Sequence, residues 1–464
     1  DTSVTGVQTC ALPISLENVV LPIGLKEIGD NAFSNCSSLY SITADKVETV
    51  GKSAFYGCSS LVSASLDSVT SLGASAFYNC SALELFKLTK GLELGTSVFS
   101  GCKGLSSVEI EEGVTALPNN TFNNCSSLKS VVLPESLELI GNYCFNKAGL
   151  ESIVIPEATL TIGYNAFAEN KSLLSVEINA PIVEFDSSIF SGCSSLETVE
   201  FVEGVEFIGY NMFYGCSSLK NVTLPNSLVG IGSYAFQGTG LESITIPENV
   251  SEIGTYYYGG TVNEWSYTYV FADCKNLSEV NIESKVLKCI GVYTFKNTPN
   301  LKNITLSSSV ETIYANAFTN SGLEEINISS VTTLGKGVFK DCKNLTAVYL
   351  SQALEKIPTE TFSGCTSLVD VILPTAVTEL GDYAFENTGV KDVKLDNISK
   401  FGSSVFDGCK DLESFKATSN DLTEIPNGMF AGCSKLTTLE LSDSLVEIGA
   451  NAFSETAIDR KSVV

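Results

Sequence analysis

The sequence predicts a repeat solenoid of about 19 turns rather than a globular enzyme, and two observations lead to this fold class. Phenylalanine recurs at intervals of 21 to 24 residues along almost the whole chain of 464 residues, with one interval of 35. Apolar residues also hold the same places in each interval, so one unit of roughly 23 residues is repeated. Such units cannot each close a core, and stacking buries their apolar sides together. The nineteen recurring residues are Phe33, Phe55, Phe77, Phe99, Phe122, Phe145, Phe167, Phe190, Phe213, Phe236, Phe271, Phe295, Phe318, Phe339, Phe362, Phe385, Phe406, Phe430 and Phe453.

The unit that ends at Phe145 shows the expected course of one turn. Alternating apolar residues around Val131 predict a short strand whose apolar side chains point inward. Pro134 is expected to end this strand because it has no N–H for a ladder hydrogen bond. Leu137 and Ile140 then lead the chain back across the core. A glycine precedes the phenylalanine by four residues in most units, and it is expected to permit a tight turn.

The recurring pattern L-x-x-I/V-x-I/L-P followed by I-G-x-x-A-F-x-x-C-x-x-L resembles BspA-like leucine-rich repeat (LRR) surface proteins. Leu241–Pro247 and Ile28–Cys36 carry the two halves of the pattern, and the resemblance extends over about residues 16–458. It implies a horseshoe with a parallel β-sheet on its concave face. Proteins of this class are typically displayed on or secreted from anaerobic bacteria and some protists, and several are adhesins. The resemblance therefore implies an extracellular or cell-surface protein that binds a protein ligand, such as a host extracellular-matrix or other cell-surface protein.

The two ends of the chain do not follow the repeat. Residues 1–14 and 459–464 match translated sequencing adapters, and we interpret them as artefacts. Arg460 is the only arginine in the chain, and the repeat stops in mid-unit after Ile458. We therefore expect a single solenoid over residues 15–458, taken as a metagenomic fragment of a longer reading frame whose signal peptide and anchor are missing.

The composition argues against several classes of function. The net charge of -26 makes the chain acidic, which disfavours binding to nucleic acid or to an anionic membrane surface. No run of about twenty apolar residues predicts a membrane span. The absence of histidine removes Ser-His-Asp catalysis, Cys-His catalysis and histidine metal sites. We therefore predict no enzyme activity, no cofactor and no metal site.

Twelve of the fifteen cysteines lie three residues after a repeat phenylalanine. In other units the same place holds Ala, Ser, Thr or Asn, which indicates a small and mostly buried packing position. Reduced structural cysteines are the favoured interpretation, and stacked disulfides or a metal ladder are the alternatives.

The outward residues of the predicted strands form the natural contact face of such a coil. Its central row includes Tyr349 and an acidic zone around Glu109, Glu177 and Glu200, with Glu111, Glu197 and Glu203 nearby. This zone predicts the docking of a basic protein patch or a divalent cation, and the alternative is an ordinary solvated face.

The single long interval, between Phe236 and Phe271, contains an insertion at about residues 255–269. It carries the only tryptophan and five tyrosines, and such side chains are frequent in binding hot spots. The alternative is a hairpin flap whose rings pack on neighbouring turns. The candidate binding residues of the insertion are Tyr256, Tyr257, Tyr258, Trp265, Tyr267 and Tyr269.

The prediction for function is a non-enzymatic protein-binding or adhesion module at the cell surface or outside the cell. One alternative is a passive stalk for a domain that this fragment lacks. Another is an intracellular protein-interaction scaffold, which many reduced cysteines would suit. The complete gene would distinguish the three, through a signal peptide or a terminal domain. The identity of the ligand and the oligomeric state do not follow from the sequence.

Overall fold

The computed structural model of the chain describes residues 16–182, 185–255 and 268–458. Within these residues the chain forms about 18 turns of roughly 23 residues, made of short parallel strands and without a helix. This confirms the predicted repeat solenoid. The turns form two compact units, unit 1 (Asp1–Ser227) and unit 2 (Leu228–Val464). The predicted adapter segments, residues 1–14 and 459–464, lie outside the described residues.

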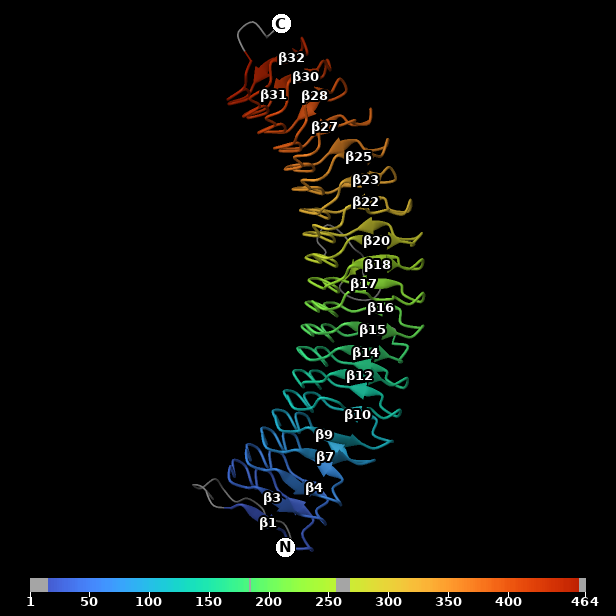
Figure 1. Cartoon of the computed structure of the whole chain (residues 1–464), viewed down its shortest axis with the longest axis vertical. Coiled ribbons are helices and arrows are strands. Elements are labelled where there is room, and N and C mark those ends of the chain that lie inside the picture. Colours follow the sequence, from blue (N-terminus) through green and yellow to red (C-terminus); the bar gives the residue numbers. More distant parts are fainter. Residues whose placement is uncertain (1–15, 183–184, 256–267, 459–464) are drawn as a thin grey trace. The chain divides into compact units, whose positions relative to one another are not determined.

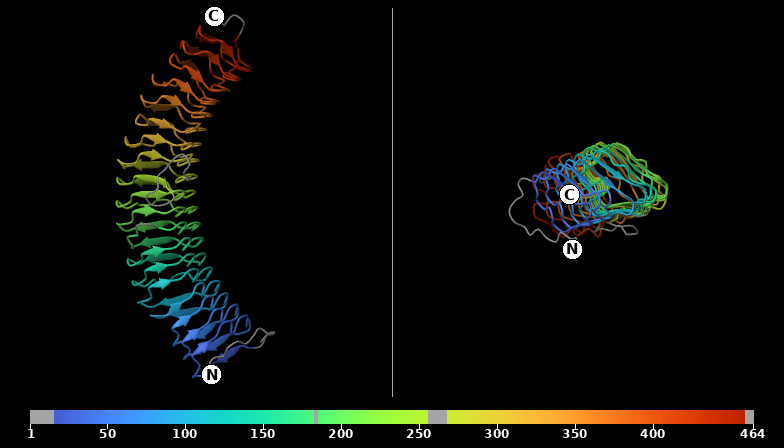
Figure 2. Two further views of the ribbon diagram at one scale, coloured as in Figure 1. Left: turned by 180° about the vertical axis from the view of Figure 1, so that it is seen from behind. Right: turned by 90° about the horizontal axis from the view of Figure 1, so that it is seen from below.

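Most turns contain a first strand of three or four residues and a shorter second strand, and the turns stack within each unit as flattened loops (Figures 1 and 2). The first strands of unit 1 are β1 (Asn18–Val20), β3 (Ser41–Thr43), β5 (Ser63–Ser65), β7 (Leu85–Leu88), β9 (Ser107–Ile110), β12 (Ser152–Ile155), β14 (Ser175–Ile178) and β15 (Thr198–Phe201). Its second strands are β2 (Glu27–Ile28), β4 (Thr49–Val50), β6 (Ser71–Leu72), β8 (Glu93–Leu94), β10 (Ala116–Leu117), β11 (Leu139–Ile140), β13 (Thr161–Ile162) and β16 (Phe207–Ile208).

Unit 2 repeats this arrangement. Its first strands are β18 (Ser243–Ile246), β20 (Glu279–Ile282), β23 (Glu325–Ile328), β25 (Ala347–Leu350), β28 (Asp392–Lys394), β30 (Ser414–Ala417) and β32 (Thr438–Leu441). Its second strands are β17 (Gly230–Gly232), β19 (Glu252–Thr255), β21 (Cys289–Ile290), β22 (Thr312–Ile313), β24 (Thr333–Leu334), β26 (Lys356–Ile357), β27 (Glu379–Leu380), β29 (Lys400–Phe401), β31 (Glu424–Ile425) and β33 (Glu447–Ile448).

Most equivalent strands of neighbouring turns pair in parallel and in register, in separate sheets of two to four strands, and the pair β17–β19 contains a register shift. In unit 1, β12, β14 and β15 form one sheet in which Val154, Glu177 and Glu200 are direct partners. In unit 2, β28, β30 and β32 form a similar sheet. This register brings the same position of every turn into one row, so the sequence repeat becomes a set of side-chain rows.

The strand predicted around Val131 does not form, although the direction of its side chains is as predicted. Residues 130–133 are not assigned to a strand, while Val131 and Leu133 are buried. After β9, the backbone N–H of Glu111 donates to the carbonyl of Leu88 in the preceding turn at 3.0 Å. Pro134 has no N–H for the equivalent bond. Pro225 and Pro374 also follow segments without an assigned first strand, whereas β12 and β18 form directly before Pro156 and Pro247, so the proline alone does not explain the missing strand.

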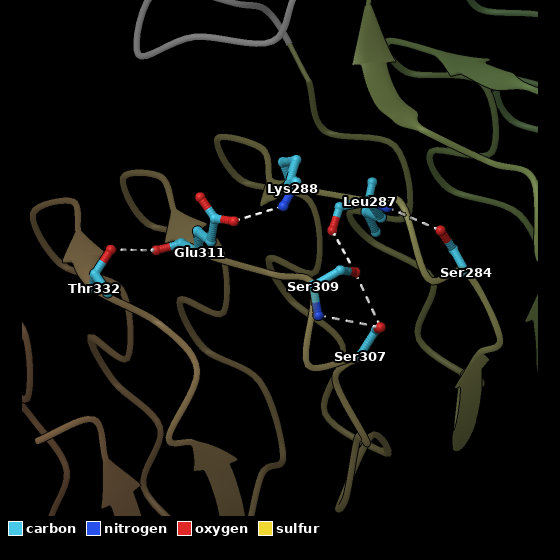
Figure 3. Close-up of polar contacts among 7 residues, drawn as sticks. All are labelled: Ser284, Leu287, Lys288, Ser307, Ser309, Glu311 and Thr332. Atoms are coloured by element: carbon cyan, nitrogen blue, oxygen red, sulfur yellow. Dashed lines mark hydrogen bonds and ion pairs between the residues drawn. The ribbon is translucent and has the colours of Figure 1, made fainter. Parts of the chain in front are cut away.

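Serine replaces this proline in several turns of unit 2 and closes the corner with hydrogen bonds (Figure 3). The hydroxyl of Ser284 accepts the N–H of Leu287 at 3.0 Å and donates to the carbonyl of Val250 in the preceding turn at 2.6 Å. In the next turn, the hydroxyl of Ser309 donates to the carbonyl of Leu287 at 2.8 Å. These hydroxyls therefore satisfy backbone groups both within a turn and between turns.

The phenylalanines form the predicted column through the core of each unit. Successive rings stack with centroids 5.0–5.8 Å apart in unit 1 and 5.2–5.9 Å apart in unit 2, nearly parallel to each other. Phe86 and Phe415 add tilted rings to the column from inward strand positions. Each ring therefore packs against the turns on both sides, as a core that no single turn can close requires.

Two left-handed residues flank most phenylalanines, two positions before and two positions after the ring. Around Phe145 they are Tyr143 and Lys147, with φ of 54° and 55°. The N–H groups of Tyr143, Phe145 and Lys147 all donate to carbonyls of the next turn, at 2.7–3.0 Å. Asparagine and glycine are frequent at these two positions because they adopt a positive φ most readily.

The glycine four residues before phenylalanine has a different role from the one predicted. Gly95, Gly141 and Gly335 are not in the left-handed region, so a tight turn does not require them. A Cβ on Gly95 would instead lie 2.4 Å from the backbone nitrogen of Ala74 in the preceding turn. Glycine therefore permits the close approach of two backbones at this corner.

The cysteines occupy the buried packing position that the sequence predicts. All fourteen described cysteines are free, and thirteen of them are buried. In eleven turns the thiol donates to the carbonyl of the phenylalanine in the preceding turn, at 3.0–3.3 Å; one example is Cys80 to Phe55. In three other turns Thr239, Thr298 and Thr388 donate to the carbonyl of their own turn's phenylalanine.

Candidate functional site

The first-strand segments present every second side chain to solvent, and we call this surface the strand face. In β12, Ser152 and Val154 point outward while Ile153 and Ile155 are buried. Neighbouring turns lie about 4.8 Å apart, so the outward residues form continuous rows. We call the row that contains Val154 the central row. It includes Lys87, Glu109, Val132, Val154, Glu177 and Glu200 in unit 1, and Asn327, Tyr349, Ile372, Lys394 and Lys416 in unit 2.

The acidic zone predicted in unit 1 contains carboxylates with different partners. The amine of Lys87 lies 2.8 Å from a carboxylate oxygen of Glu109 and 2.9 Å from one of Glu111. Hydrogen bonds that the amine of Lys87 donates to Glu109 and Glu111 raise the pKa of Lys87. The bonds from Lys87 and from the backbone N–H of Lys90 lower the pKa of Glu111. Glu109 and Glu111 thus share one cation within the protein.

The carboxylate of Glu203 binds backbone N–H groups of the next turn instead of remaining free at the surface. Its carboxylate accepts the N–H groups of Asn226 and Ser227 in the next turn, at 3.1 and 3.0 Å. These two bonds hold the pKa of Glu203 below its usual range. By contrast, Glu177 and Glu200 are exposed and form no ion pair within the described part of the chain. The predicted acidic zone therefore reduces to these two neighbours on β14 and β15, with Glu197 beside them.

Two valines precede these carboxylates in the central row. The side chain of Val132 is 83% exposed and that of Val154 is 48% exposed. A shallow hollow of about 390 Å³ lies beside Val132 and is also lined by Glu109 and Ser130. The strand face of unit 1 thus carries two exposed valines, which are followed in the central row by two carboxylates without an ion pair among the described residues.

Unit 2 also carries a pair of exposed apolar side chains, and the pair begins at the predicted site residue Tyr349. Tyr349 is 54% exposed on β25, and Ile372 in the next turn is 89% exposed. Lys394 follows on β28 and forms no ion pair within the described residues, whereas Lys416 on β30 contacts Glu440 at 2.7 Å. The exposed apolar pair of unit 2 is therefore followed by lysines rather than by carboxylates.

Small residues produce a second hollow on the strand face of unit 1. Ala64 occupies an inward strand position that Ile42 and Phe86 hold in the adjoining turns. The hollow measures about 670 Å³ and extends between the serines of β5 and the side chains of Leu85 and Lys87. It is an open depression with a hydroxyl-rich floor.

Most of the predicted insertion site lies outside the described residues. This applies to Tyr256, Tyr257, Tyr258, Trp265 and Tyr267, so their binding role stays a prediction. The described end of the insertion begins at Thr268, which is buried against Gly254 and Gly291.

Tyr269 packs within unit 2. Its ring stacks between those of Tyr234 and Tyr293, with centroids at 5.2 and 4.5 Å. The amine of Lys296 lies 4.9 Å from the centroid of Tyr293. Tyr269 is therefore held in an aromatic stack, and its predicted role as a binding residue stays untested.

Sequence reasoning did not single out some of these features. Ile372 and Lys394 belong to the predicted outward row, but only the structure shows how far Ile372 projects. The stack of Tyr234, Tyr269 and Tyr293 has a sequence signal, because each tyrosine stands two residues before a repeat phenylalanine.

Metal sites and membrane-spanning helices were the other kinds of feature to consider in the described part of the chain, and neither is present there. No group of three or more acidic, cysteine or histidine side chains there is arranged to hold a metal ion. None of the described segments forms a helix that is long and apolar enough to cross a membrane.

Comparisons with known proteins agree with the repeat. The profile of the BspA type leucine-rich repeat region, in six copies, matches residues 8–129, 49–174, 138–263, 266–391 and 332–459. Among solved structures, the chain is similar to a leucine-rich repeat protein from Bacteroides ovatus ATCC 8483, with 25% identity and a TM-score of 0.55, over 82% of this chain and 87% of that chain. A leucine-rich cell surface protein from Faecalibacterium prausnitzii A2-165 has 23% identity and a TM-score of 0.38, over 92% and 88% of the two chains. The search of curated proteins gave no match.

The profile accounts for almost the whole repeat region, including the turns on both sides of the insertion. Its repeat has the length and the parallel strands of the fold described above. The chain belongs to the BspA type leucine-rich repeat family.

Proposed function

We propose that this chain is a non-enzymatic protein-binding module, an adhesin-like protein that works at the cell surface or outside the cell. The strand face is its interaction surface. The family supports this proposal, because stacked repeats create the extended binding surface that solenoid proteins use.

The observation that carries the proposal is the pair of exposed apolar side chains on neighbouring turns of unit 2. Tyr349 and Ile372 project from the central row, at 54% and 89% exposure. Apolar surface that is held outward next to charged residues favours binding to another protein, with the apolar part as the anchor and the charged part as the rim. The tyrosine adds contact area with a polar tip at low conformational cost.

Binding of purified chain to immobilised extracellular-matrix and cell-surface glycoproteins tests the proposal. We expect saturable retention of the chain by at least one of these proteins in surface plasmon resonance. Replacing the pair, Tyr349→Ser with Ile372→Ser, is expected to weaken the retention at least tenfold, because it removes the anchor.

The matched control is Val286→Ser, which removes an exposed apolar side chain of unit 2 that is not on the central row. It should leave retention unchanged. Equal loss in the control and in the paired variant would contradict the assignment to the strand face. Absence of retention on the whole set of glycoproteins would favour the passive stalk instead.

The predicted site in the insertion has a separate test. Gly254 and Thr268 lie against each other, so residues 256–267 can be replaced by two glycines without separating the flanking turns. If the insertion also binds, its removal lowers retention while the thermal midpoint is unchanged. A fall in the thermal midpoint alone would make the insertion a packing element.

A further inference from the structure

We propose that the strand face of unit 1 binds the strand face of unit 2 in a second copy of this chain. The inference rests on the proposed function, because it uses the same surface and names one protein partner. It arises from the match between two four-turn segments of the central row, which we call the acidic segment (Val132, Val154, Glu177 and Glu200) and the basic segment (Tyr349, Ile372, Lys394 and Lys416).

The acidic segment begins with two apolar residues and continues with two carboxylates. Val154 on β12 is the direct register partner of Glu177, and Glu177 is that of Glu200. Neither glutamate has a cation within ion-pair distance among the described residues. Val132, one turn before Val154, is the most exposed large apolar residue of the segment.

The basic segment has the same order with the opposite charge. Tyr349 and Ile372 are the exposed apolar pair, and Lys394 and Lys416 follow as register partners on β28 and β30. Lys394 has no carboxylate within ion-pair distance among the described residues. Lys416 contacts Glu440, at the end of the segment, and this exposed contact can exchange for another carboxylate.

In both segments successive residues are one turn apart, so the segments match position by position; where strands pair, from β12 to β15 and from β28 to β30, this spacing is about 4.8 Å. When two copies meet face to face with their turns running in the same direction, Val132 faces Tyr349 and Val154 faces Ile372. Glu177 then faces Lys394, and Glu200 faces Lys416. The apolar residues cover each other, and each free charge meets an opposite charge.

A single contact of this kind is weak. The contact uses one row of four side chains from each copy, over about 14 Å, whereas a stable interface buries roughly 800 Å² and 20–30 residues per partner. The net charge of -26 also repels two copies at long range. Screening at physiological salt limits that repulsion to about 8 Å while leaving close contacts.

The contact joins two different surfaces, so a copy that uses one of its segments still carries the other. Each copy has one acidic and one basic segment, and a third copy can bind to either free segment. Many copies on one surface would therefore hold two surfaces together through many weak contacts, because the effective concentration is high.

Clustering of protein-coated beads uses this multivalency as a test. Beads that carry the full chain are expected to cluster at about 0.15 M salt, where the Debye length is about 8 Å. Beads with Glu177→Lys and Glu200→Lys should not cluster with each other, because both segments are then basic. Beads with Lys394→Glu and Lys416→Glu should likewise stay dispersed, because both segments are then acidic.

Mixing the two reversed variants is the decisive arm, since a basic segment on one bead again meets an acidic segment on the other. We expect the mixture to cluster to at least half of the unsubstituted level. Controls with the same change in charge are Glu135→Lys with Glu157→Lys and Lys343→Glu with Lys410→Glu, at exposed positions off the central row. These should cluster like the unsubstituted chain.

Dispersed beads with the unsubstituted chain would overturn the proposal, as would clustering of either reversed variant alone or a mixture that stays dispersed. The glycoprotein retention assay on the same preparations separates this outcome from the proposed function. Retention without clustering overturns only the self-association. Loss of both overturns the strand face as an interaction surface.

Discussion

At the corners where glycine stands four residues before phenylalanine, two backbones lie too close for an added Cβ atom. Gly95 illustrates this, because its hydrogen faces the backbone of Ala74 and Gly73 in the preceding turn. The sequence predicts the glycine, since it recurs at a fixed place. It does not predict the reason, because the close approach depends on a neighbouring turn 21 residues away that only the register defines.

We predict that Gly95→Ala destabilises the protein by about 1–3 kcal/mol, the usual range for forcing extra atoms into a packed region. The added Cβ would lie 2.4 Å from a backbone nitrogen, which no rotation of a side chain relieves. Urea unfolding followed by circular dichroism measures the change.

The control for this prediction is Gly24→Ala, because nothing lies within 4 Å of the added atom and Gly24 is not in the left-handed region. Its unfolding curve should match that of the unsubstituted chain within about 0.5 kcal/mol. Equal curves for Gly95→Ala and the unsubstituted chain would show that the two backbones can separate freely.

At the scale of the element, hydrogen bonds between turns explain what the sequence pattern misses. The alternation around Val131 correctly predicts which side chains point inward, but no strand forms there. The apolar periodicity of the sequence does not reveal the serine corners, although the hydroxyl of a serine such as Ser284 joins two turns. The row of buried cysteines, which we call the thiol row, is also partly predictable. The sequence predicts a small packing position three residues after phenylalanine, but it does not predict the hydrogen bonds from the thiols to phenylalanine carbonyls.

The thiol row predicts a loss of stability in alkaline solution. Burial raises the pKa of Cys274, Cys342 and Cys409 from the usual value near 9 to about 11. Their contribution to stability is complete below pH 9, where unfolded and folded thiols are both protonated. As the pH rises from 9 to 11, only the unfolded thiols ionise, so the free energy of unfolding falls.

Each such cysteine is expected to lower the free energy of unfolding by about 1.4 kcal/mol per pH unit within this window. The measurement is urea unfolding between pH 8 and 10 in the presence of a reductant. The matched variant replaces these three cysteines by threonine, the residue that Thr239, Thr298 and Thr388 supply at the same place. The variant should depend less steeply on pH than the unsubstituted chain. Identical slopes would show that these thiols ionise as readily in the fold as in the unfolded chain.

At the scale of the whole molecule, repetition makes the fold easy to predict and the site difficult. Nineteen phenylalanines in register define the solenoid, because each turn needs the same partner above and below it. The site depends instead on where the rows depart from the repeat. Glu109 lies in the same row as Glu177, yet Glu109 forms an ion pair with Lys87, while two backbone N–H groups occupy the nearby carboxylate of Glu203.

The exposed apolar residues are also departures from the repeat. Val132, Val154, Tyr349 and Ile372 all lie at a position where most turns carry a polar residue. Their exposed fractions, from 48% to 89%, are seen only in the structure. We therefore regard the strand face, and not the aromatic insertion alone, as the part of the molecule that meets other proteins.

The most direct test of this account is retention of the chain by immobilised glycoproteins when all four apolar residues are replaced, Val132→Ser, Val154→Ser, Tyr349→Ser and Ile372→Ser. These side chains project outward, so the thermal midpoint should stay within a few degrees of that of the unsubstituted chain. We predict that retention falls at least tenfold, while the variant that lacks residues 256–267 keeps more of it. Full retention by the four-residue variant, with loss only when the insertion is removed, would contradict the account.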